Sequence, residues 1–220
     1  MSISTYSFDV FSVQVIEHPL VADKIRELRD VTTSNSTFIR LADEISRFLA
    51  YEAFRTTAVV ATTVDTPVTK NAPALRVDTE FVIVPILRAG LGMCPAVQSV
   101  LPRHRVCLVG LRRNEATLQP EVYLDGLPEN LNGATVVVCD PMLATGGSLS
   151  MVLDMLAARE AGHVTVLCLI AAAPGIAYVR EKHHDVTIVT AALDRELTDR
   201  GFITPGLGDA GDRLFGPPVR

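Results

Sequence analysis

Residues 136–148 read Val-Val-Val-Cys-Asp-Pro-Met-Leu-Ala-Thr-Gly-Gly-Ser, and this stretch decides the fold. Its first three residues are apolar and β-branched, a composition typical of a strand buried on both faces of a parallel sheet. Asp140 follows this strand, and Pro141 ends it because proline has no amide hydrogen for a further ladder bond. From Leu149 to Leu156, apolar residues recur at helical spacing. The stretch therefore predicts a strand, a loop and a helix of an α/β protein.

The loop between this strand and this helix has the composition of a phosphate site. Backbone amides and the helix dipole meet at such a loop and attract an anion. Thr145 and Ser148 add hydroxyl donors, while Gly146 and Gly147 allow a close approach or a positive φ. The alternative is an ordinary turn with a serine cap, but Asp140 beside the amides favours a ligand site. A P-loop is excluded because no Gly-Lys-Ser/Thr follows the glycines.

The segment 138–148 resembles the phosphoribosyl-diphosphate motif of type I phosphoribosyltransferases, in the form found in uracil phosphoribosyltransferases. Many members have two adjacent acids at the strand end; here Cys139 takes the first place, as in the uracil branch. The resemblance implies that Asp140 binds the ribose 2- and 3-hydroxyls and that 144–148 hold the 5-phosphate. The phosphoribosyl-diphosphate ligands that it implies are Arg88, Arg113, Asp140, Pro141, Met142, Leu143, Ala144, Thr145, Gly146, Gly147, Ser148 and Asp209.

Arg88 follows a second apolar run, residues 81–84, which also predicts a buried strand. Taken alone, an arginine at a strand end commonly pairs with a nearby carboxylate. However, residues 84–93, Val-Pro-Ile-Leu-Arg-Ala-Gly-Leu-Gly-Met, are similar to the family's pyrophosphate loop. The resemblance implies that Arg88 contacts the diphosphate, for which a planar guanidinium with several donors is suited.

Arg113 follows a third apolar run, residues 106–109. A solvated charged loop is the alternative interpretation of its surroundings. The resemblance makes Arg113 a second diphosphate ligand, although Arg112 stands where the family usually has tyrosine. Residues 117–128 resemble the family's flexible arm, with Gly126 in place of a common lysine.

The tail, residues 201–216, reads Gly-Phe-Ile-Thr-Pro-Gly-Leu-Gly-Asp-Ala-Gly-Asp-Arg-Leu-Phe-Gly and is predicted to be too glycine-rich for a regular element. Glycine-rich loops often present backbone to a ligand. Its Pro-Gly-Leu-Gly-Asp-Ala-Gly-Asp segment closely resembles the corresponding segment of uracil phosphoribosyltransferases. This implies a C-terminal hood in which Ile203, Gly208, Asp209 and Ala210 bind uracil. Asp209 would also reach phosphoribosyl diphosphate or its metal.

The rest of the chain supplies the other elements of one domain over 13–220, preceded by an extension, 1–12. Adjacent histidines on a helix diverge, so His183 and His184 are interpreted as a solvated pair rather than metal ligands. Gly162 is expected to end the helix that follows the phosphate loop. The remaining expected elements are strands at 13–16, 164–170 and 187–190, helices from 19, over 38–49 and from 174 to 183, and short strands and turns over 56–73.

Composition and charge narrow the class of protein. The 220 residues carry a formal charge of −5 and a pI near 5.5, which argues against nonspecific nucleic-acid binding. No apolar run approaches the roughly 18 residues that span a bilayer, and the N-terminus lacks signal-peptide features. The four cysteines lie in or beside apolar runs without CxxC spacing, which indicates buried, reduced thiols in a cytoplasmic protein.

The resemblance as a whole implies a type I phosphoribosyltransferase fold, a mostly parallel sheet flanked by helices, and the conversion of uracil and phosphoribosyl diphosphate to UMP and diphosphate in pyrimidine salvage. Its catalytic residues would be Arg88, Arg113, Asp140 and Asp209, with Mg²⁺ carried mainly by the diphosphate. The family also implies a homodimer or higher oligomer, and GTP is an allosteric effector of some members. Two alternatives are a pyrimidine-sensing RNA-binding regulator and an inactive phosphoribosyl-diphosphate-binding subunit.

Overall fold

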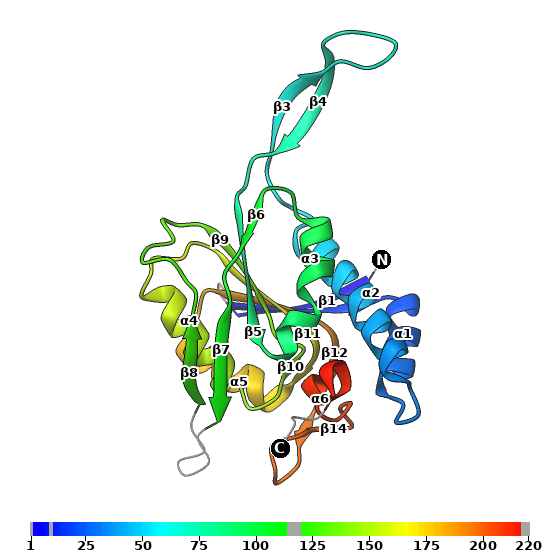
Figure 1. Ribbon diagram of the computed structural model, residues 1–220, viewed down its shortest axis with the longest axis vertical. Helices are drawn as coiled ribbons and strands as arrows, with labels where there is room; N and C mark the ends of the chain where they lie inside the picture. The colour runs from blue at the N-terminus through cyan, green and yellow to red at the C-terminus, as the bar shows by residue number, and fades with distance from the viewer. Residues whose placement is uncertain (1, 9–10, 114–119, 217–220) are drawn as a thin grey trace.

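The computed structural model of the protein describes residues 2–8, 11–113 and 120–216. Its centre is a mostly parallel sheet in the order β1-β2-β12-β11-β9-β5-β7-β8, with β10 beside β11 and β6 beside β5 (Figure 1). This architecture confirms the α/β class expected from the sequence. The strands of the sheet are β1 (Ser2–Phe8), β2 (Phe11–Glu17), β5 (Phe81–Leu87), β6 (His104–Val106), β7 (Val109–Arg113), β8 (Pro120–Asp125), β9 (Thr135–Cys139), β10 (Met142–Leu143), β11 (Val164–Ala172) and β12 (Val186–Asp194).

Helices cover both faces of the sheet, so each face has its own hydrophobic core. One core joins the sheet to α1, α2, α3 and α6, and the other joins it to α4 and α5. Strands β9 and β11 are buried along almost their whole length, as their continuous apolar sequences predict. The helices are α1 (Pro19–Arg29), α2 (Asn35–Ala53), the 3₁₀ helix η1 (Ala89–Gly92), α3 (Cys94–Val100), α4 (Gly147–Ala157), α5 (Ala173–Lys182) and α6 (Ala210–Phe215).

The register of the central strands brings the predicted site segments together. Cys139 at the end of β9 pairs with Pro85 of β5 on one side and with Leu167 of β11 on the other. The residues after β5 and β9 therefore leave the sheet at one edge. A Cβ on Gly90 would lie 2.2 Å from the Cys139 carbonyl oxygen, so only glycine allows η1 to approach this closely.

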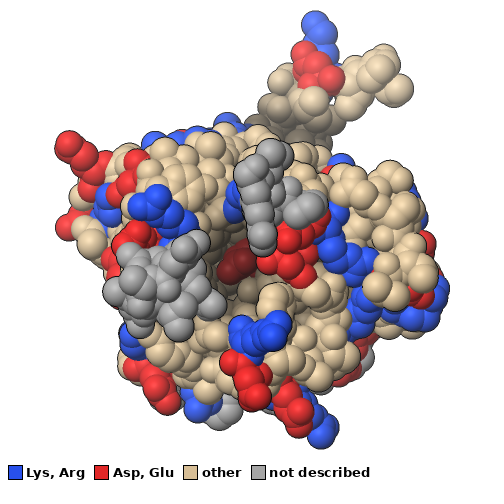
Figure 2. Space-filling model, turned by 60° about the horizontal axis from the view of Figure 1, so that its bottom comes forward, with Lys and Arg blue, Asp and Glu red and all other residues tan. Residues whose placement is uncertain are grey.

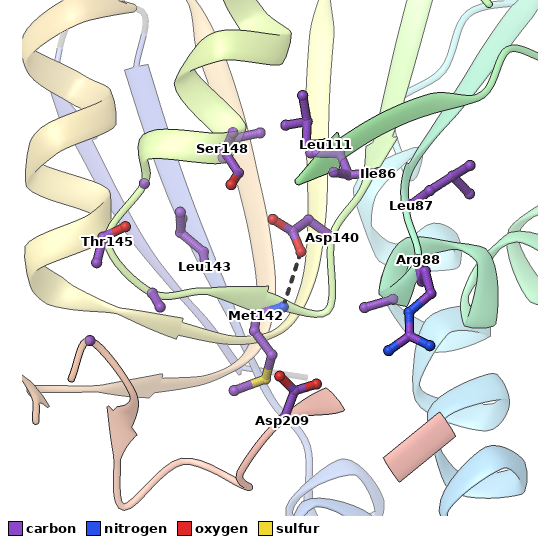
Figure 3. Close-up of a pocket in the computed structure, with 15 residues that line it drawn as sticks. Ile86, Leu87, Arg88, Leu111, Asp140, Met142, Leu143, Thr145, Ser148 and Asp209 are labelled. Atoms are coloured by element: carbon purple, nitrogen blue, oxygen red, sulfur yellow. Dashed lines mark hydrogen bonds between the residues drawn. The ribbon is translucent and has the colours of Figure 1, made fainter. Parts of the chain in front are cut away.

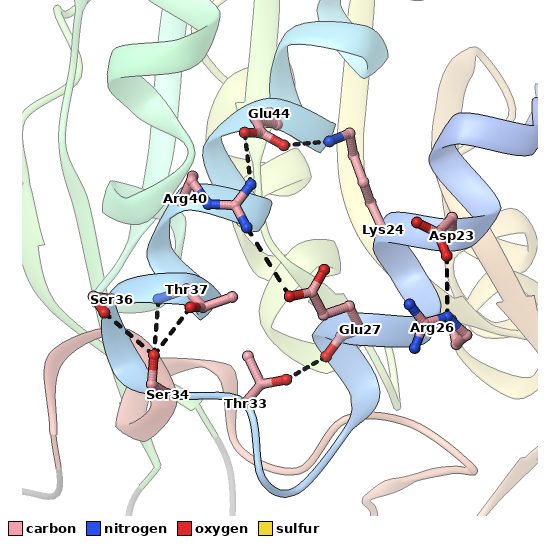
Figure 4. Close-up of polar contacts among 10 residues, drawn as sticks. All are labelled: Asp23, Lys24, Arg26, Glu27, Thr33, Ser34, Ser36, Thr37, Arg40 and Glu44. Carbon is pink, nitrogen blue, oxygen red and sulfur yellow. Dashed lines mark hydrogen bonds and ion pairs between the residues drawn. The ribbon is translucent and has the colours of Figure 1, made fainter.

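Helix α2 begins at a residue that the local sequence determines, and packing against the core stabilises it. Ser34 caps its start, since the Ser34 hydroxyl accepts from the Thr37 amide (Figure 4). Phe38 begins the expected apolar stripe and is fully buried. On the outer side, Glu44 binds both Lys24 of α1 and Arg40 of its own helix. The packing of α1 against α2 thus combines an apolar interior with ion pairs at its rim.

Several element boundaries differ from the sequence prediction. The expected strand over 106–109 is two strands, β6 and β7, that lie on the same register beside β5 and are interrupted at 107–108. Helix α4 ends at Ala157 rather than at Gly162, whose amide bonds the Ala134 carbonyl near β9. The segments with the strongest apolar patterns were predicted most closely.

The prediction that the tail contains no regular element was wrong. It forms β14 (Ile203–Thr204), which pairs with β13 (Glu196–Leu197), and the short helix α6. The Asp209 carboxylate caps α6 by accepting from the Asp212 amide at 2.9 Å, and Leu214 is buried against the core. A cap and the buried side chains of Ala210 and Leu214 thus stabilise a helix that Gly211 disfavours.

Besides β8, which pairs antiparallel with β7, and the β13–β14 pair, two parts of the structure lie beyond the sheet's parallel centre. The first, β1, falls in the stretch expected to precede the domain and pairs antiparallel with β2 at the sheet edge. The second is a hairpin of β3 (Val59–Val64) and β4 (Ala72–Val77), which projects from the body of the molecule (Figure 1).

The described cysteines and helices agree with the compositional analysis. All four cysteines, Cys94, Cys107, Cys139 and Cys168, are buried and free. None of the helices in the described ranges combines the length and the apolarity that crossing a bilayer would require.

Candidate functional site

A cavity of about 330 Å³ lies at the carboxyl edge of the sheet (Figure 3). The space-filling view of this face is hollowed at its centre, with acidic atoms inside the hollow and basic side chains around it (Figure 2). The lining comes from the ends of β5 and β9, the phosphate loop and the tail. Its described residues are Ile86, Leu87, Arg88, Ala89, Leu111, Asp140, Met142, Leu143, Ala144, Thr145, Gly146, Ser148, Leu149, Gly201 and Asp209.

Asp140 lies half-buried at the floor of this cavity, directly after β9. Its backbone amide bonds the Leu167 carbonyl of β11, and its carboxylate accepts weakly from the Met142 amide at 3.4 Å. Burial raises the pKa of Asp140 to about 7, and the bond from Met142 opposes this rise only in part. Among the described groups only the Met142 amide donates to this carboxylate, so Asp140 is available to hydrogen-bond donors on a ligand.

The neighbouring thiols are unsuited to nucleophilic chemistry. Burial raises the pKa of Cys139 and of Cys168 above the ordinary value for cysteine, and the charge of Asp140 acts in the same direction. A thiol must ionise to attack. Both cysteines therefore serve as apolar packing beneath the cavity.

The phosphate loop has the backbone that its glycines predict. Gly146 has a φ of 84° and is the N-cap of α4. A Cβ at this position would lie 2.8 Å from the Gly175 carbonyl oxygen of α5, so both the conformation and the space require glycine. Ser148 and Thr145 are exposed to the cavity. The first amides of α4 lack acceptors within the helix and are available to an anion.

Arg88 lies on the opposite side of the cavity from this loop (Figure 3). Its side chain is 47% exposed and forms an ion pair with Asp212 of α6 at 3.2 Å. The carboxylate pairing considered for Arg88 from the sequence alone is therefore present. Because both groups are well exposed, the pair is weak enough to exchange for a ligand.

The tail reaches the cavity mainly through Asp209. Figure 3 places this carboxylate beside Met142. Ile203 and Ala210 are buried in the core instead, while Gly208 is exposed with a φ of 83°. None of these three lines the cavity.

The structure thus brings together nine of the predicted site residues, but not all of them. Pro141 and Gly147 do not line the cavity although they flank residues that do. The backbone of Arg113 ends β7, and its side chain lies outside the described part of the chain. Asp212, the partner of Arg88, was missed; its only signal was the second acid of the quoted Gly-Asp-Ala-Gly-Asp run.

The prediction of a solvated histidine pair was wrong for His183. Its side chain is only 10% exposed, and the ring lies 3.0 Å from the Ser150 hydroxyl and 3.7 Å from Asp154 of α4. Burial lowers the pKa of His183. Its position at the end of α5 makes it a packing contact between α5 and α4. Among the described residues, no three His, Cys, Asp or Glu side chains cluster closely enough to hold a metal on their own.

Asp140 should give the protein a specific dependence of stability on pH. Its pKa in the folded state lies above the ordinary 3.8, so the folded state binds this proton more tightly than the unfolded state. Relative to an Asp140→Asn variant, the wild type should lose stability as pH rises from about 4 to about 7 and remain constant above that range. The loss should be at most about 4 kcal/mol, since each pKa unit corresponds to about 1.4 kcal/mol.

Urea unfolding of both proteins between pH 4 and 8 measures this difference. A difference in free energy of unfolding that stayed constant over the whole range would show that Asp140 ionises normally. Asp154→Asn, which alters an exposed acid on α4, is the control for a general effect of removing one charge.

Comparisons with known proteins identify the family of the chain. The family model of uracil phosphoribosyltransferase matches residues 15–217. Uracil phosphoribosyltransferases of Kineococcus radiotolerans and Streptococcus sanguinis are 49% and 45% identical, each over 93% of this chain and 98% of their own length.

Solved structures agree with these sequence matches. The AQ2163 protein from Aquifex aeolicus is 36% identical, with a TM-score of 0.88 over 94% of this chain and 100% of its own. A hypoxanthine phosphoribosyltransferase from Staphylococcus aureus shares only the fold, at 10% identity and a TM-score of 0.50 over 83% of this chain and 84% of its own. The protein therefore has the type I phosphoribosyltransferase fold, and it belongs to the uracil phosphoribosyltransferase family.

Proposed function

We propose that the protein transfers ribose 5-phosphate from phosphoribosyl diphosphate to N1 of uracil, which yields UMP and diphosphate. The observation that carries this proposal is the shared cavity of three predicted parts: the carboxylate of Asp140, the loop 144–148 and Asp209 of the tail. Neither the described residues nor the comparisons favour an RNA-binding regulator or an inactive subunit. The buried reduced thiols support a cytoplasmic location.

Asp140 would bind the ribose. A carboxylate carries acceptors for two hydroxyl donors at once, so it can take the 2- and 3-hydroxyls of the ribose together. These donors would favour the ionised form of Asp140, whose pKa burial raises in the free protein. The ribose would thereby provide the hydrogen bonds that the cavity floor lacks.

The loop 144–148 would hold the 5-phosphate and set the position of the sugar. Its residues Ala144, Thr145, Gly146 and Ser148 line the cavity, and Ser148 and Thr145 add hydroxyls to the amides of the loop. Because Gly146 is fixed against the Gly175 carbonyl, this anion site is preformed. The ribose carbon that reacts would then lie between the phosphate loop and Arg88.

Arg88 and Arg113 would stabilise the departing diphosphate. As the bond from the ribose to the diphosphate breaks, negative charge builds on the leaving oxygens, and guanidinium groups bind such oxygens in pairs. Arg88 would exchange Asp212 for the diphosphate, since that ion pair is exposed and weak. The base must already be aligned with the ribose, so this reaction depends on positioning rather than on a protein nucleophile.

The acidic residues fit a Mg²⁺ ion that is carried mainly by the diphosphate. Asp140 and Asp209 provide oxygen donors on the cavity wall, and Mg²⁺ is commonly held by one or two carboxylates together with substrate phosphates. When bound, the ion would neutralise charge on the diphosphate.

The tail would read uracil through its backbone. Uracil presents two carbonyl acceptors and one N–H donor along one edge, which amides and a carbonyl in fixed order can match. Gly208, exposed at a φ of 83°, lies next to Asp209 at the cavity and can carry such groups without a side chain in the way. Ile203 and Ala210, buried on either side, would fix the segment.

The protein is also proposed to be a homodimer or a higher homo-oligomer. The β3–β4 hairpin projects into solvent with exposed apolar side chains, including Val59, Val64 and Leu75. A hairpin without packing is at best marginally stable in water. An apolar groove at α1 and α2, bordered by Phe48 and Tyr51, offers further surface of the same kind.

The first test is the reaction itself. The wild type should form UMP from labelled uracil and phosphoribosyl diphosphate, and it should use cytosine at least about 100-fold less well. Cytosine replaces one acceptor with a donor and removes the N3 proton, and each buried unsatisfied group costs about 1–3 kcal/mol. Absence of UMP with both substrates and Mg²⁺ present would refute the proposed activity.

The second test separates the diphosphate site from the phosphate loop. Arg88→Ala should lower kcat by about tenfold or more while UMP affinity stays within about threefold, because UMP has no diphosphate. Gly146→Val should weaken both UMP and phosphoribosyl diphosphate, since both present a 5-phosphate. Arg40→Ala, which removes an exposed pair on α2, is the control. Equal loss of UMP binding in Arg88→Ala and Gly146→Val would contradict this division.

The third test is the mass of the protein in solution. Light scattering should give at least twice the 23.8 kDa of one chain. Leu75→Glu should shift the distribution toward the monomer, because Leu75 is 71% exposed on the hairpin. A wild type with the mass of one chain at micromolar concentration would contradict the proposed oligomer.

A further inference from the structure

The most buried ion pair that reaches the tail joins Arg29 to Asp194. Both terminal guanidinium nitrogens of Arg29 donate to the carboxylate, Nη1 to Oδ2 and Nη2 to Oδ1, each at 2.7 Å. The Asp194 side chain is 6% exposed and that of Arg29 is 21% exposed. Arg29 is the last residue of α1 and Asp194 the last of β12, so both groups come from rigid elements.

This pair also binds both backbone groups of one tail residue, Gly206. Arg29 Nη1 donates to the Gly206 carbonyl at 2.7 Å, and the Gly206 amide donates to Asp194 Oδ2 at 2.9 Å. The four hydrogen bonds form a closed set between the two side chains and the backbone of one residue. Gly206 is itself buried.

Gly206 lies within the segment proposed to recognise the base, so its hydrogen bonds to Arg29 and Asp194 fix the backbone of that segment. It lies between Ile203 and residues 208–210, the two parts of the tail proposed to bind uracil. Gly206 has a φ of 56°, and a Cβ there would lie 2.1 Å from the Ile203 carbonyl oxygen. The tail therefore makes a tight turn at the residue that the ion pair holds.

The energetics of the Arg29–Asp194 pair indicate that it positions the tail more than it stabilises the fold. Removing two charges from water is costly, and a buried pair often stabilises a protein no more than apolar residues of the same volume would. Apolar residues could not, however, bind an amide and a carbonyl of the same glycine. The forked guanidinium and the two carboxylate oxygens can do so in fixed directions.

We propose that Arg29 and Asp194 are positioning residues that hold the tail in the conformation that selects the base. This inference rests on the proposed function, because it assumes that the tail reads uracil. The pair lies outside the set of residues that line the phosphate and ribose parts of the cavity. Its loss should therefore change recognition of the base while recognition of the sugar phosphate stays intact.

The test compares two ligands in calorimetric titrations of the full-length protein: UMP, which carries uracil on C1 of the ribose, and ribose 5-phosphate, which carries a hydroxyl there. Asp194→Asn places an amide donor against either Arg29 or the Gly206 amide, so UMP affinity should fall by about tenfold or more. Ribose 5-phosphate affinity should stay within about threefold. Arg29→Lys keeps the charge but not the fork, so its effect on UMP should lie between those of the wild type and Asp194→Asn.

The matched control is Arg26→Lys, on the same helix. Arg26 pairs with Asp23 at 3.0 Å, with both side chains 67% exposed (Figure 4), and its replacement should change neither affinity. Steady-state kinetics on the same variants should show a higher KM for uracil and a KM for phosphoribosyl diphosphate within about threefold of the wild type.

The outcomes separate this inference from the proposed function. A wild type that binds UMP no better than ribose 5-phosphate would refute base recognition altogether. If the wild type prefers UMP but Asp194→Asn and Arg29→Lys retain that preference, the positioning role is wrong. It is also wrong if both variants lose the two ligands equally, since the pair would then support the whole domain. Should Asp194→Asn fail to fold, Arg29→Lys decides between these outcomes.

Discussion

The positions of the cavity groups depend on one constraint: β5, β9 and β11 are parallel and in register. Cys139 pairs with both neighbouring strands, so the residues after β5 and β9 leave the sheet at the same level. Gly90 strengthens the constraint because its missing side chain lets η1 contact the Cys139 carbonyl directly. The sheet thus sets the positions of Arg88 and Asp140, and the loops after the strands add the other polar groups of the cavity.

The site combines a rigid half with an exchangeable half. The rigid half is Asp140 and the phosphate loop, fixed by β11 and by the contact between Gly146 and Gly175. The exchangeable half is the exposed ion pair between Arg88 and Asp212, which links the diphosphate side of the cavity to the tail. Asp212 follows the segment proposed to bind the base, so a ligand that replaces Asp212 at Arg88 would free a side chain two residues beyond that segment. The two substrates would thereby affect each other's binding through one weak contact.

The sequence predicted those parts of the fold and site that have a local signal. The apolar run before Asp140 and the glycines after it were enough to place a strand, a carboxyl group and a phosphate loop. Helix α6 was missed because Gly211 and the glycines before it disfavour a helix, and the contacts that compensate, such as the burial of Leu214 and the bonds from Arg213 to Leu28 and Asp30, come from distant segments. The burial of His183 was missed for a different reason, since it depends on α4, which local sequence does not show. The partners Arg29 and Asp194, 165 positions apart, carry no local signal at all.

The distance in sequence between Arg29 and Asp194 affects the order in which the parts of the nascent protein become available. Synthesis proceeds from the N-terminus at about 5–20 residues per second, so the early parts of a chain are available before the later ones. Helix α1 and the phosphate loop emerge well before Asp194 and the tail. The ion pair of Arg29 can therefore form only after Asp194 has been synthesised, and the hydrogen bond of Asp194 to Gly206 only after Gly206 has been. A growing chain therefore contains the residues of the phosphate loop before it contains the segment proposed to select a base.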